Sequence, residues 1–173
     1  MREPFVIWFT GLSSSGKTTL SQRVYNILNK NINTLILLDG DDVRLAFGSD
    51  LGYREKDRLT QIKRIQRISK MLVGQGISVI VAALYSHGDL LKWNRDNFSN
   101  YLEIFLDISV SKATGRDNKN LYAPAQKGKI KNVVGVDIKY HKPEFSDITI
   151  DMNDESTPEH IVDKIMKKIS VQT

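Results

Sequence analysis

The sequence of 173 residues contains no cysteine, only four prolines and no long apolar run. Without thiol groups the chain cannot form disulfide bonds or thiolate metal sites, and its composition is compatible with a cytosolic setting. Its apolar runs are short enough for strands, whereas a membrane-spanning helix needs about 20 apolar residues. The first run, residues 5–9, follows no signal-peptide pattern. We therefore expect a cytoplasmic protein without a membrane partner.

The sequence also lacks a strong excess of charge of either sign. Lys and Arg number 25 against 20 for Asp and Glu, so the formal net charge is +5. Because the basic residues are spread along the chain, a positive cleft for anionic nucleotides accounts for the excess more simply than a nucleic-acid surface does, and we expect no nucleic-acid partner. The length and the 40% hydrophobic content are typical of one folded domain, which we predict over residues 1–173.

What the sequence does contain is GLSSSGKT at residues 11–18. An apolar run precedes it at residues 5–9, and apolar residues at helical spacing follow it at residues 19–29. The pattern G-x-x-x-x-G-K-[ST] between a strand and a helix is typical of a loop that holds phosphate oxygens with its backbone N–H groups and with the positive end of the helix. An ordinary glycine-rich turn is the alternative, and the strand-to-helix context disfavours it.

The residue types in this loop suit a nucleotide phosphate site. Two glycines allow a close backbone approach, the lysine can reach the outer phosphates, and the threonine hydroxyl can bind Mg²⁺. The residues predicted to hold the nucleotide in this segment are Gly11, Ser13, Ser14, Ser15, Gly16, Lys17, Thr18 and Thr19.

A second group of polar residues follows the next apolar run. Residues 34–38 are apolar and lead into DGDD at residues 39–42, after which a short helix and loop are predicted over residues 43–51. In an open α/β sheet, ligands bind at the carboxyl ends of the strands. Carboxylates beside a phosphate loop repel one another, so they are expected where Mg²⁺ or a reacting hydroxyl offsets their charge. An acidic turn would use the same residue types and stays open as an alternative.

The remaining periodicity completes an alternation of strands and helices. Strand-like runs occupy residues 77–84, 102–106 and 148–150, and apolar residues at helical spacing occupy residues 55–74 and 157–170. We predict an α/β fold in which about five parallel strands form a sheet with helices on both faces.

Residues 116–137 differ in character from the rest. They contain basic residues and glycines and show little apolar periodicity. A charged, poorly packed segment of this length in a compact domain is typical of a lid over an active site. We predict a basic lid that is mobile without ligand and becomes ordered when nucleotides bind. A disordered surface insertion is the alternative.

Several motifs in a fixed order identify a family. Along the chain they are GLSSSGKT (11–18), LDGDDVR (38–44), DLGY (50–53), DR (57–58), RDNKNLY (116–122) and KGKIKNVVG (127–135). With these motifs the sequence resembles the adenylylsulfate (APS) kinases over nearly the whole chain. The resemblance implies a P-loop kinase that transfers the γ-phosphate of ATP to the ribose 3′-hydroxyl of adenylylsulfate with the help of Mg²⁺. It also implies a small-molecule nucleotide as substrate and a homodimer as the assembly.

The resemblance further implies roles for single residues. The expected catalytic residues are Lys17, Asp39 and Asp41. Asp39 would bind Mg²⁺ together with Thr18, and Asp41 would orient the attacking hydroxyl. Arg116, at the base of the lid, would belong to the ATP side. The residues expected to bind the acceptor nucleotide are Asp41, Arg44, Tyr53, Arg58, Gln61, Tyr85, Ser86, Lys131 and Val133.

The departures from the family pattern concentrate on the acceptor. After the third strand the family has Ile-Ser-Pro-aromatic-Arg, whereas this chain has YSHGD at residues 85–89, so that Asp89 replaces an arginine. In the lid the family has Phe-Thr-Gly, whose ring stacks on the acceptor base, whereas this chain has Val133. The family's second stacking Phe is Tyr53 here, and an Asn of the family aligns with Gln61. Because the ATP-side pattern is kept, the departures indicate a changed acceptor.

A branch of the family phosphorylates cytidine diphosphoramidate, an intermediate in decorating bacterial capsular polysaccharide with phosphoramidate. Its smaller base and less charged terminal group suit Val133 and Asp89, so we predict this acceptor. One alternative is an adenylylsulfate kinase that makes 3′-phosphoadenylylsulfate in sulfate assimilation. An alternative from another class is a P-loop regulatory or nucleic-acid-binding protein. The intact lysine and aspartates of the motifs disfavour a binding module without activity.

Overall fold

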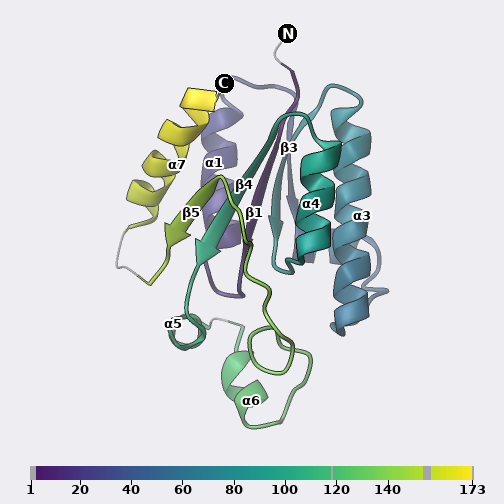
Figure 1. Cartoon of the computed structure of the whole chain (residues 1–173), viewed down its shortest axis with the longest axis vertical. Coiled ribbons are helices and arrows are strands. Elements are labelled where there is room, and N and C mark those ends of the chain that lie inside the picture. Colours follow the sequence, from purple (N-terminus) through teal and green to yellow (C-terminus); the bar gives the residue numbers. More distant parts are fainter. Residues whose placement is uncertain (1–2, 118, 154–156, 173) are drawn as a thin grey trace.

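The computed structural model describes residues 3–117, 119–153 and 157–172. Its centre is a five-stranded parallel sheet in the order β2-β3-β1-β4-β5 (Figure 1). The strands are β1 (Val6–Gly11), β2 (Leu35–Asp39), β3 (Ser78–Ala83), β4 (Tyr101–Asp107) and β5 (Ile148–Asp151). The predicted α/β fold is confirmed.

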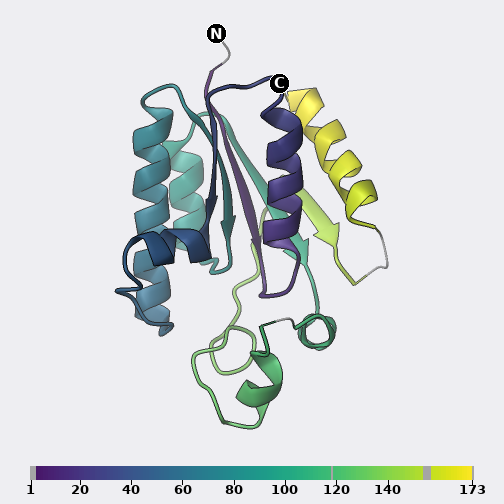
Figure 2. The same cartoon turned by 180° about the vertical axis from the view of Figure 1, so that it is seen from behind.

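Helices lie on both faces of this sheet. The helices are α1 (Lys17–Leu28), α2 (Gly40–Ala46), α3 (Glu55–Val73), α4 (Gly88–Asn97), α5 (Val110–Gly115), α6 (Tyr122–Gln126) and α7 (Pro158–Gln172), of which α5 and α6 lie beyond the end of the sheet rather than on a face (Figure 1). Helices α1 and α7 pack side by side on one face, and α4 lies on the other face against α3 (Figures 1 and 2). Among the described residues, none of these helices is both long and apolar enough to cross a membrane.

Strand β1 lies at the centre of the sheet and is buried along its whole length. All six of its residues are buried, and Phe9 lies opposite Ala82 on one side and Ile104 on the other. A parallel strand that helices cover on both faces needs such a continuous apolar run. The central position of β1 brings the loop that follows it to the middle of the carboxyl edge of the sheet.

The carboxyl edge of the sheet faces the lid (residues 116–137, of which residue 118 lies outside the described residues). In Figure 1 the arrowhead of β4 points toward α5, and both α5 and α6 lie beyond the end of the sheet. Because all strands are parallel, the segments that follow β1, β2 and β3 meet at this same edge. This is the place where open α/β sheets bind ligands.

Two predicted segments differ from the structure. The short helix expected from residue 43, within a helix and loop over residues 43–51, already begins at Gly40, because the Asp39 side chain accepts a hydrogen bond of 2.9 Å from the N–H group of Asp41 and caps the helix. The lid, expected as an irregular loop, contains the short helix α6.

Candidate active site

A cavity of about 990 Å³ lies at the carboxyl edge of the sheet, at the upper end of the size range of small-ligand sites. Most of the predicted site residues line it: Ser13, Ser14, Gly16, Lys17, Thr18, Thr19, Asp39, Asp41, Arg44, Tyr53, Arg58, Gln61, Tyr85, Arg116, Lys131 and Val133. Most of the residues that form this edge belong to two groups. The loop half consists of residues 11–19 and Asp39, and the arginine half consists of Arg44, Tyr53, Arg58, Tyr85 and Val133.

Backbone geometry builds the loop between β1 and α1. A Cβ atom on Gly11 would lie 2.7 Å from the carbonyl oxygen of Leu106, so a side chain has no room there. Gly16 has a φ of 94°, a conformation that favours glycine, just before the first turn of α1. The N–H group of Ser15 donates a hydrogen bond of 3.2 Å to the carbonyl oxygen of Leu12 and closes the turn. The start of α1 therefore faces the cavity, where the positive end of a helix attracts anions.

The Lys17 side chain turns back over this loop. Its Nζ donates to the carbonyl oxygens of Gly11 at 3.0 Å and of Leu12 at 2.6 Å. Burial lowers the pKa of Lys17 from 10.5 to about 8, although the carboxylates of Asp39 and Asp41 act in the opposite direction. The ammonium group is thus still charged at neutral pH but incompletely compensated, which favours an anion beside it.

Two aspartates and a threonine form a connected group next to Lys17. Thr18 Oγ1 donates to Asp39 Oδ2 at 2.6 Å, and Asp39 Oδ1 accepts the Asp41 N–H group. The Asp41 carboxylate forms an ion pair with Lys119 of the lid. Burial is the largest single influence on the pKa of Lys119 and lowers it, but the hydrogen bond with Asp41 and the negative charges of Asp41 and Asp39 together outweigh burial, so the net shift is upward. The lid therefore supplies a stable positive charge to the predicted catalytic carboxylate.

The oxygen atoms of this group fit Mg²⁺. In proteins Mg²⁺ is usually held by one or two carboxylates, together with waters and the phosphates of a substrate. Thr18 and Asp39 offer a hydroxyl and a carboxylate oxygen 2.6 Å apart. No three Asp, Glu, His or Cys side chains within the described residues form a ready metal cluster. Phosphate oxygens and waters would have to complete the coordination.

Hydrogen bonds to backbone carbonyls hold the arginine half. Arg44 is only 7% exposed and donates from Nη1 to two carbonyl oxygens of the loop before α3, at 2.7 and 2.9 Å. Arg58 donates from Nε to the Tyr53 carbonyl oxygen at 2.9 Å and from Nη2 to the Asn132 carbonyl oxygen of the lid at 2.7 Å. Both guanidinium groups lie over the Tyr53 ring, 4.7 and 5.5 Å from its centroid. Two fixed positive charges thus face the cavity.

Three more predicted residues, Gln61, Tyr85 and Val133, line the wall of the cavity. Gln61 Nε2 donates to the Gly40 carbonyl oxygen at 3.0 Å, which ties α3 to the start of α2. The Tyr85 hydroxyl donates to Glu55 Oε1 at 2.5 Å. Val133 is 7% exposed and presents an aliphatic side chain to the cavity. The wall is therefore polar at Tyr85 and apolar at Val133.

The lid is better packed than its sequence indicates, and the prediction of a poorly packed segment is wrong. Tyr122, Ala125, Val133 and Val134 are all buried. The Tyr122 hydroxyl donates to the Ser13 carbonyl oxygen at 3.1 Å and fastens the lid to the phosphate loop. The apolar positions escape a periodicity search because the backbone between them is irregular. Ordering of the lid on nucleotide binding stays a prediction.

Two residues expected near the acceptor do not line the cavity. Ser86 is 1% exposed, and its hydroxyl donates to the His141 carbonyl oxygen. Because neighbouring side chains of an extended segment point to opposite sides, Tyr85 and Ser86 cannot both face the cavity. The Asp89 side chain is 94% exposed at the start of α4. The expected inversion of charge beside the acceptor is therefore wrong.

Three residues that the sequence did not single out contact this site, namely Glu55, Lys119 and Tyr122. Lys119 and Tyr122 belong to the motif RDNKNLY at residues 116–122, so a position-by-position treatment of that motif could have found them. Glu55 gave no signal, because its partner Tyr85 is 30 residues away in the sequence.

Comparison with known sequences agrees with this geometry. The sequence model of the adenylylsulphate kinase family matches residues 3–151. The chain belongs to this family. It is 36% identical to the cytidine diphosphoramidate kinase of Campylobacter jejuni, over 97% of this chain and 98% of that protein. It is 39% identical to the adenylyl-sulfate kinase of Pseudomonas aeruginosa, over 87% of this chain and 78% of that protein.

Solved structures give the same assignment of fold. An APS kinase of Mycobacterium tuberculosis in complex with AMPPNP and APS has a TM-score of 0.86 at 27% identity, and the match covers 98% of this chain and 99% of that one. The shikimate kinase of Aquifex aeolicus, with a TM-score of 0.60 at 18% identity over 96% of each chain, shares the fold. As a member of the adenylylsulfate kinase family, the chain is an ATP-dependent nucleotide kinase that phosphorylates a hydroxyl group.

Proposed function

We propose that this member of the adenylylsulfate kinase family phosphorylates the ribose 3′-hydroxyl of cytidine diphosphoramidate, a step in the biosynthesis of capsular polysaccharide phosphoramidate. The observation that carries the proposal is the wall of the arginine half, where the aliphatic Val133 occupies the position expected for a stacking ring. A pyrimidine has less ring surface to stack than adenine, so it loses less there. The Campylobacter jejuni kinase named for this substrate also aligns with nearly the whole chain.

In this proposal the chain acts mainly by positioning and by neutralising charge, which is what phosphoryl transfer requires. Lys17 and the N–H groups at the start of α1 hold the phosphates of ATP and offset the charge that develops on the transferred group. Asp41 accepts a hydrogen bond from the attacking 3′-hydroxyl and takes up its proton. Lys119 keeps Asp41 placed. When Mg²⁺ is bound by Thr18 and Asp39, it supplies further positive charge at the phosphates.

The arginine half would hold the acceptor. Arg44 and Arg58 are fixed by backbone carbonyls, so their positive charges are already in place for an anionic diphosphate group. Lys131 adds an exposed positive charge from the lid, and Tyr53, which is 53% exposed, would contact the base with the ring surface that the two guanidinium groups leave uncovered. Arg116 lines the cavity and would bind ATP.

The test is a comparison of acceptors under one set of conditions. The protein is incubated with MgATP and with cytidine diphosphoramidate, cytidine diphosphate or adenylylsulfate, and kcat/KM is measured for each, with the product identified by mass spectrometry and phosphorus NMR. We expect kcat/KM for cytidine diphosphoramidate to exceed that for adenylylsulfate by about tenfold or more. A clear preference for adenylylsulfate would contradict the proposal.

An adenylylsulfate kinase of sulfate assimilation is the second candidate. The Pseudomonas aeruginosa kinase favours it, since its identity of 39% is slightly higher, although over a smaller share of the chain. If this candidate is correct, the same experiment yields 3′-phosphoadenylylsulfate as the main product and little phosphorylation of the cytidine compound.

We further propose that the chain acts as a homodimer, which its resemblance to the family implies. Size-exclusion chromatography with light scattering should give about twice the chain mass of 19.7 kDa. A mass that stays at that of one chain across the accessible concentrations would contradict this.

A further inference from the structure

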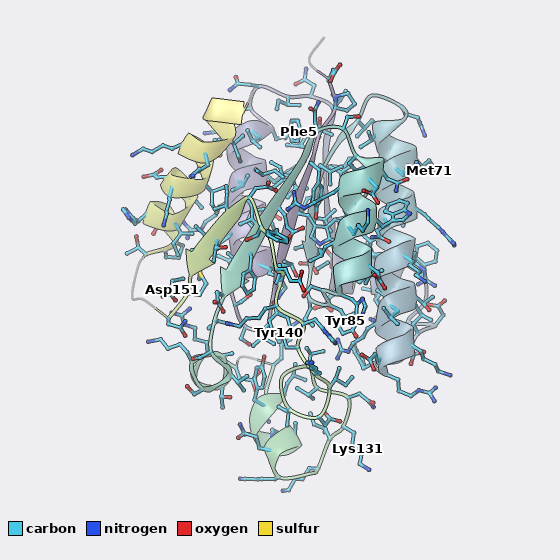
Figure 3. The ribbon with its side chains drawn as sticks, in the orientation of Figure 1. Phe5, Met71, Tyr85, Lys131, Tyr140 and Asp151 are labelled. Carbon is cyan, nitrogen blue, oxygen red and sulfur yellow. The ribbon has the colours of Figure 1, made fainter. Side chains whose placement is uncertain are left out.

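Glu55 and Tyr85 form a pair that the mechanism above does not use. Tyr85 follows β3 and Glu55 begins α3, so two separate elements bring them together. Tyr85 is only 3% exposed and lines the cavity. Figure 3 shows Tyr85 at the level where the strands end, on the side of the molecule that carries α3 and above the part of the lid that carries Lys131. The pair therefore lies at the ligand edge of the sheet.

The direction of the hydrogen bond decides what the pair can recognise. The Tyr85 hydroxyl donates to Glu55 Oε1 at 2.5 Å. A phenol has one proton, so an oxygen that has donated it can only accept further hydrogen bonds, and an ionised carboxylate also only accepts. Burial raises the pKa of Tyr85, and the hydrogen bond to Glu55 acts in the same direction, so the phenol keeps its proton. Tyr85 thus offers the cavity a hydrogen-bond acceptor, and Glu55, which contacts Tyr85 from outside the cavity lining, adds a negative charge beside it.

Arg58 adds a positive charge close to this pair. Its charge lowers the pKa of Tyr85, against burial and Glu55. Hydrogen bonds to the Tyr53 and Asn132 carbonyl oxygens hold its guanidinium group in place. A group with both an anionic oxygen and an N–H donor could place the oxygen toward Arg58 and the donor toward Tyr85 and Glu55. A sulfate offers only oxygen acceptors, so it could form no hydrogen bond with Tyr85 and Glu55, whose free capacity is also only to accept.

We propose that Tyr85 and Glu55 determine specificity by selecting an acceptor nucleotide whose terminal group carries N–H donors, as a phosphoramidate does, over one that ends in an oxyanion alone. This inference rests on the proposed function. Tyr85 and Glu55 would select the terminal group of the acceptor, whereas Val133 and Tyr53 would contact its base.

Cytidine diphosphoramidate and cytidine diphosphate isolate this effect, because they share the base and differ in the terminal amino group. We expect the wild-type protein to prefer the amidate in kcat/KM by about tenfold. In Glu55→Gln this ratio should fall to about one, because the variant loses the negative charge and its amide can donate to the Tyr85 oxygen, which frees the phenol proton for an oxyanion. Tyr85→Phe should lower the ratio about threefold, because Glu55 stays but loses its partner. Glu144→Gln and Tyr25→Phe, which change a carboxylate and a phenol elsewhere in the chain and outside the Tyr85–Glu55 pair, are the matched controls and should keep the wild-type ratio.

The outcomes separate the two proposals. A wild-type protein that leaves cytidine diphosphoramidate unphosphorylated overturns the proposed function and this inference with it. A wild-type protein that phosphorylates it, while Glu55→Gln keeps the wild-type ratio, overturns only the role of the pair. An equal loss on both acceptors would mark a structural role and overturn the inference as well. Unchanged KM values for ATP and unchanged thermal unfolding temperatures show that the variants are folded.

Discussion

The two halves of the cavity are built in different ways. In the loop half, most functional atoms belong to one continuous segment, residues 11–19, fixed by the central strand before it and by a helix after it. In the arginine half, they come from α2, from the loop before α3, from α3 itself, from the end of β3 and from the lid. In the proposed function, phosphate binding would therefore depend on local geometry, whereas recognition of the acceptor would depend on contacts between distant segments.

The largest effect is expected at Lys17 of the loop half and at Asp41 beside it. We predict that Lys17→Ala and Asp41→Ala each reduce kcat by about 10²-fold or more, because each removes a charge placed for phosphoryl transfer and neither side chain fills the core. Steady-state kinetics measure the loss, and circular dichroism checks the fold. Lys127→Ala, which removes an exposed lid lysine outside the cavity lining, is the control. Turnover near the wild-type rate in either variant would refute the role of that residue.

A smaller effect is expected within the arginine half alone. Val133→Phe should shift the ratio of kcat/KM values toward adenylylsulfate by about twentyfold, because stacking of a base on an aromatic ring is worth roughly 1–3 kcal/mol. Acceptor competition assays measure the shift, and thermal unfolding detects overpacking of this buried position.

Two controls separate the ring from other changes. Val133→Leu adds volume without an aromatic face and should leave the ratio nearly unchanged. Asp89→Arg should also leave it unchanged, because the Asp89 side chain is 94% exposed and lies outside the cavity lining. If Asp89→Arg shifts the ratio as much as Val133→Phe does, the base pocket is misplaced.

The difference between the halves also explains what the sequence can predict. Strand-like and helix-like segments alternate along the chain, so periodicity alone predicted a parallel sheet covered by helices. The phosphate loop could be predicted because residues 11–18 lie directly between a strand-like segment and a helix-like one. Nothing local connects Tyr85 with Glu55 or Asp41 with Lys119, since those pairs form only when the chain folds. The exposure of Asp89 at the start of α4 also depends on the fold, so comparison of motifs wrongly predicted that its charge lies beside the acceptor.

Within the loop half, pH offers a prediction of intermediate size. Lys17 has a pKa near 8, below its usual 10.5, so it is charged below pH 8 and neutral above it. Only the charged form pairs with phosphate, so the Kd for AMPPNP should rise by about tenfold for each pH unit above 8. Isothermal titration calorimetry between pH 7 and 9.5 measures this. The Lys17→Met variant should bind AMPPNP more weakly, and its Kd should not begin to rise near pH 8. A wild-type Kd that stays constant to pH 9.5 would contradict the assignment of Lys17 to phosphate binding.

The titration of Lys17 changes the stability of the fold in the opposite direction from nucleotide affinity as the pH rises. Between pH 8 and 10.5 the unfolded chain holds the Lys17 proton and the folded chain does not, so the unfolded state binds more protons. The contribution of Lys17 to the free energy of unfolding therefore increases with pH in that window. Nucleotide binding and stability thus change in opposite directions with pH at this one group.

The smallest effect concerns the hydrogen bond that joins the lid to the loop half. Burial raises the pKa of Tyr122 to about 12, so its hydroxyl stays protonated and donates to the Ser13 carbonyl oxygen at neutral pH. Tyr122→Phe removes this one bond and should raise the KM for ATP about fivefold, since a neutral hydrogen bond is worth about 1 kcal/mol. The KM for the acceptor should hold, because the lid contacts the arginine half separately, through the Asn132 carbonyl oxygen and Arg58. Steady-state kinetics with each substrate varied in turn measure both values, with Tyr25→Phe as the control. An equal rise in both KM values would mean that the lid responds as one body and that the two halves are not independent.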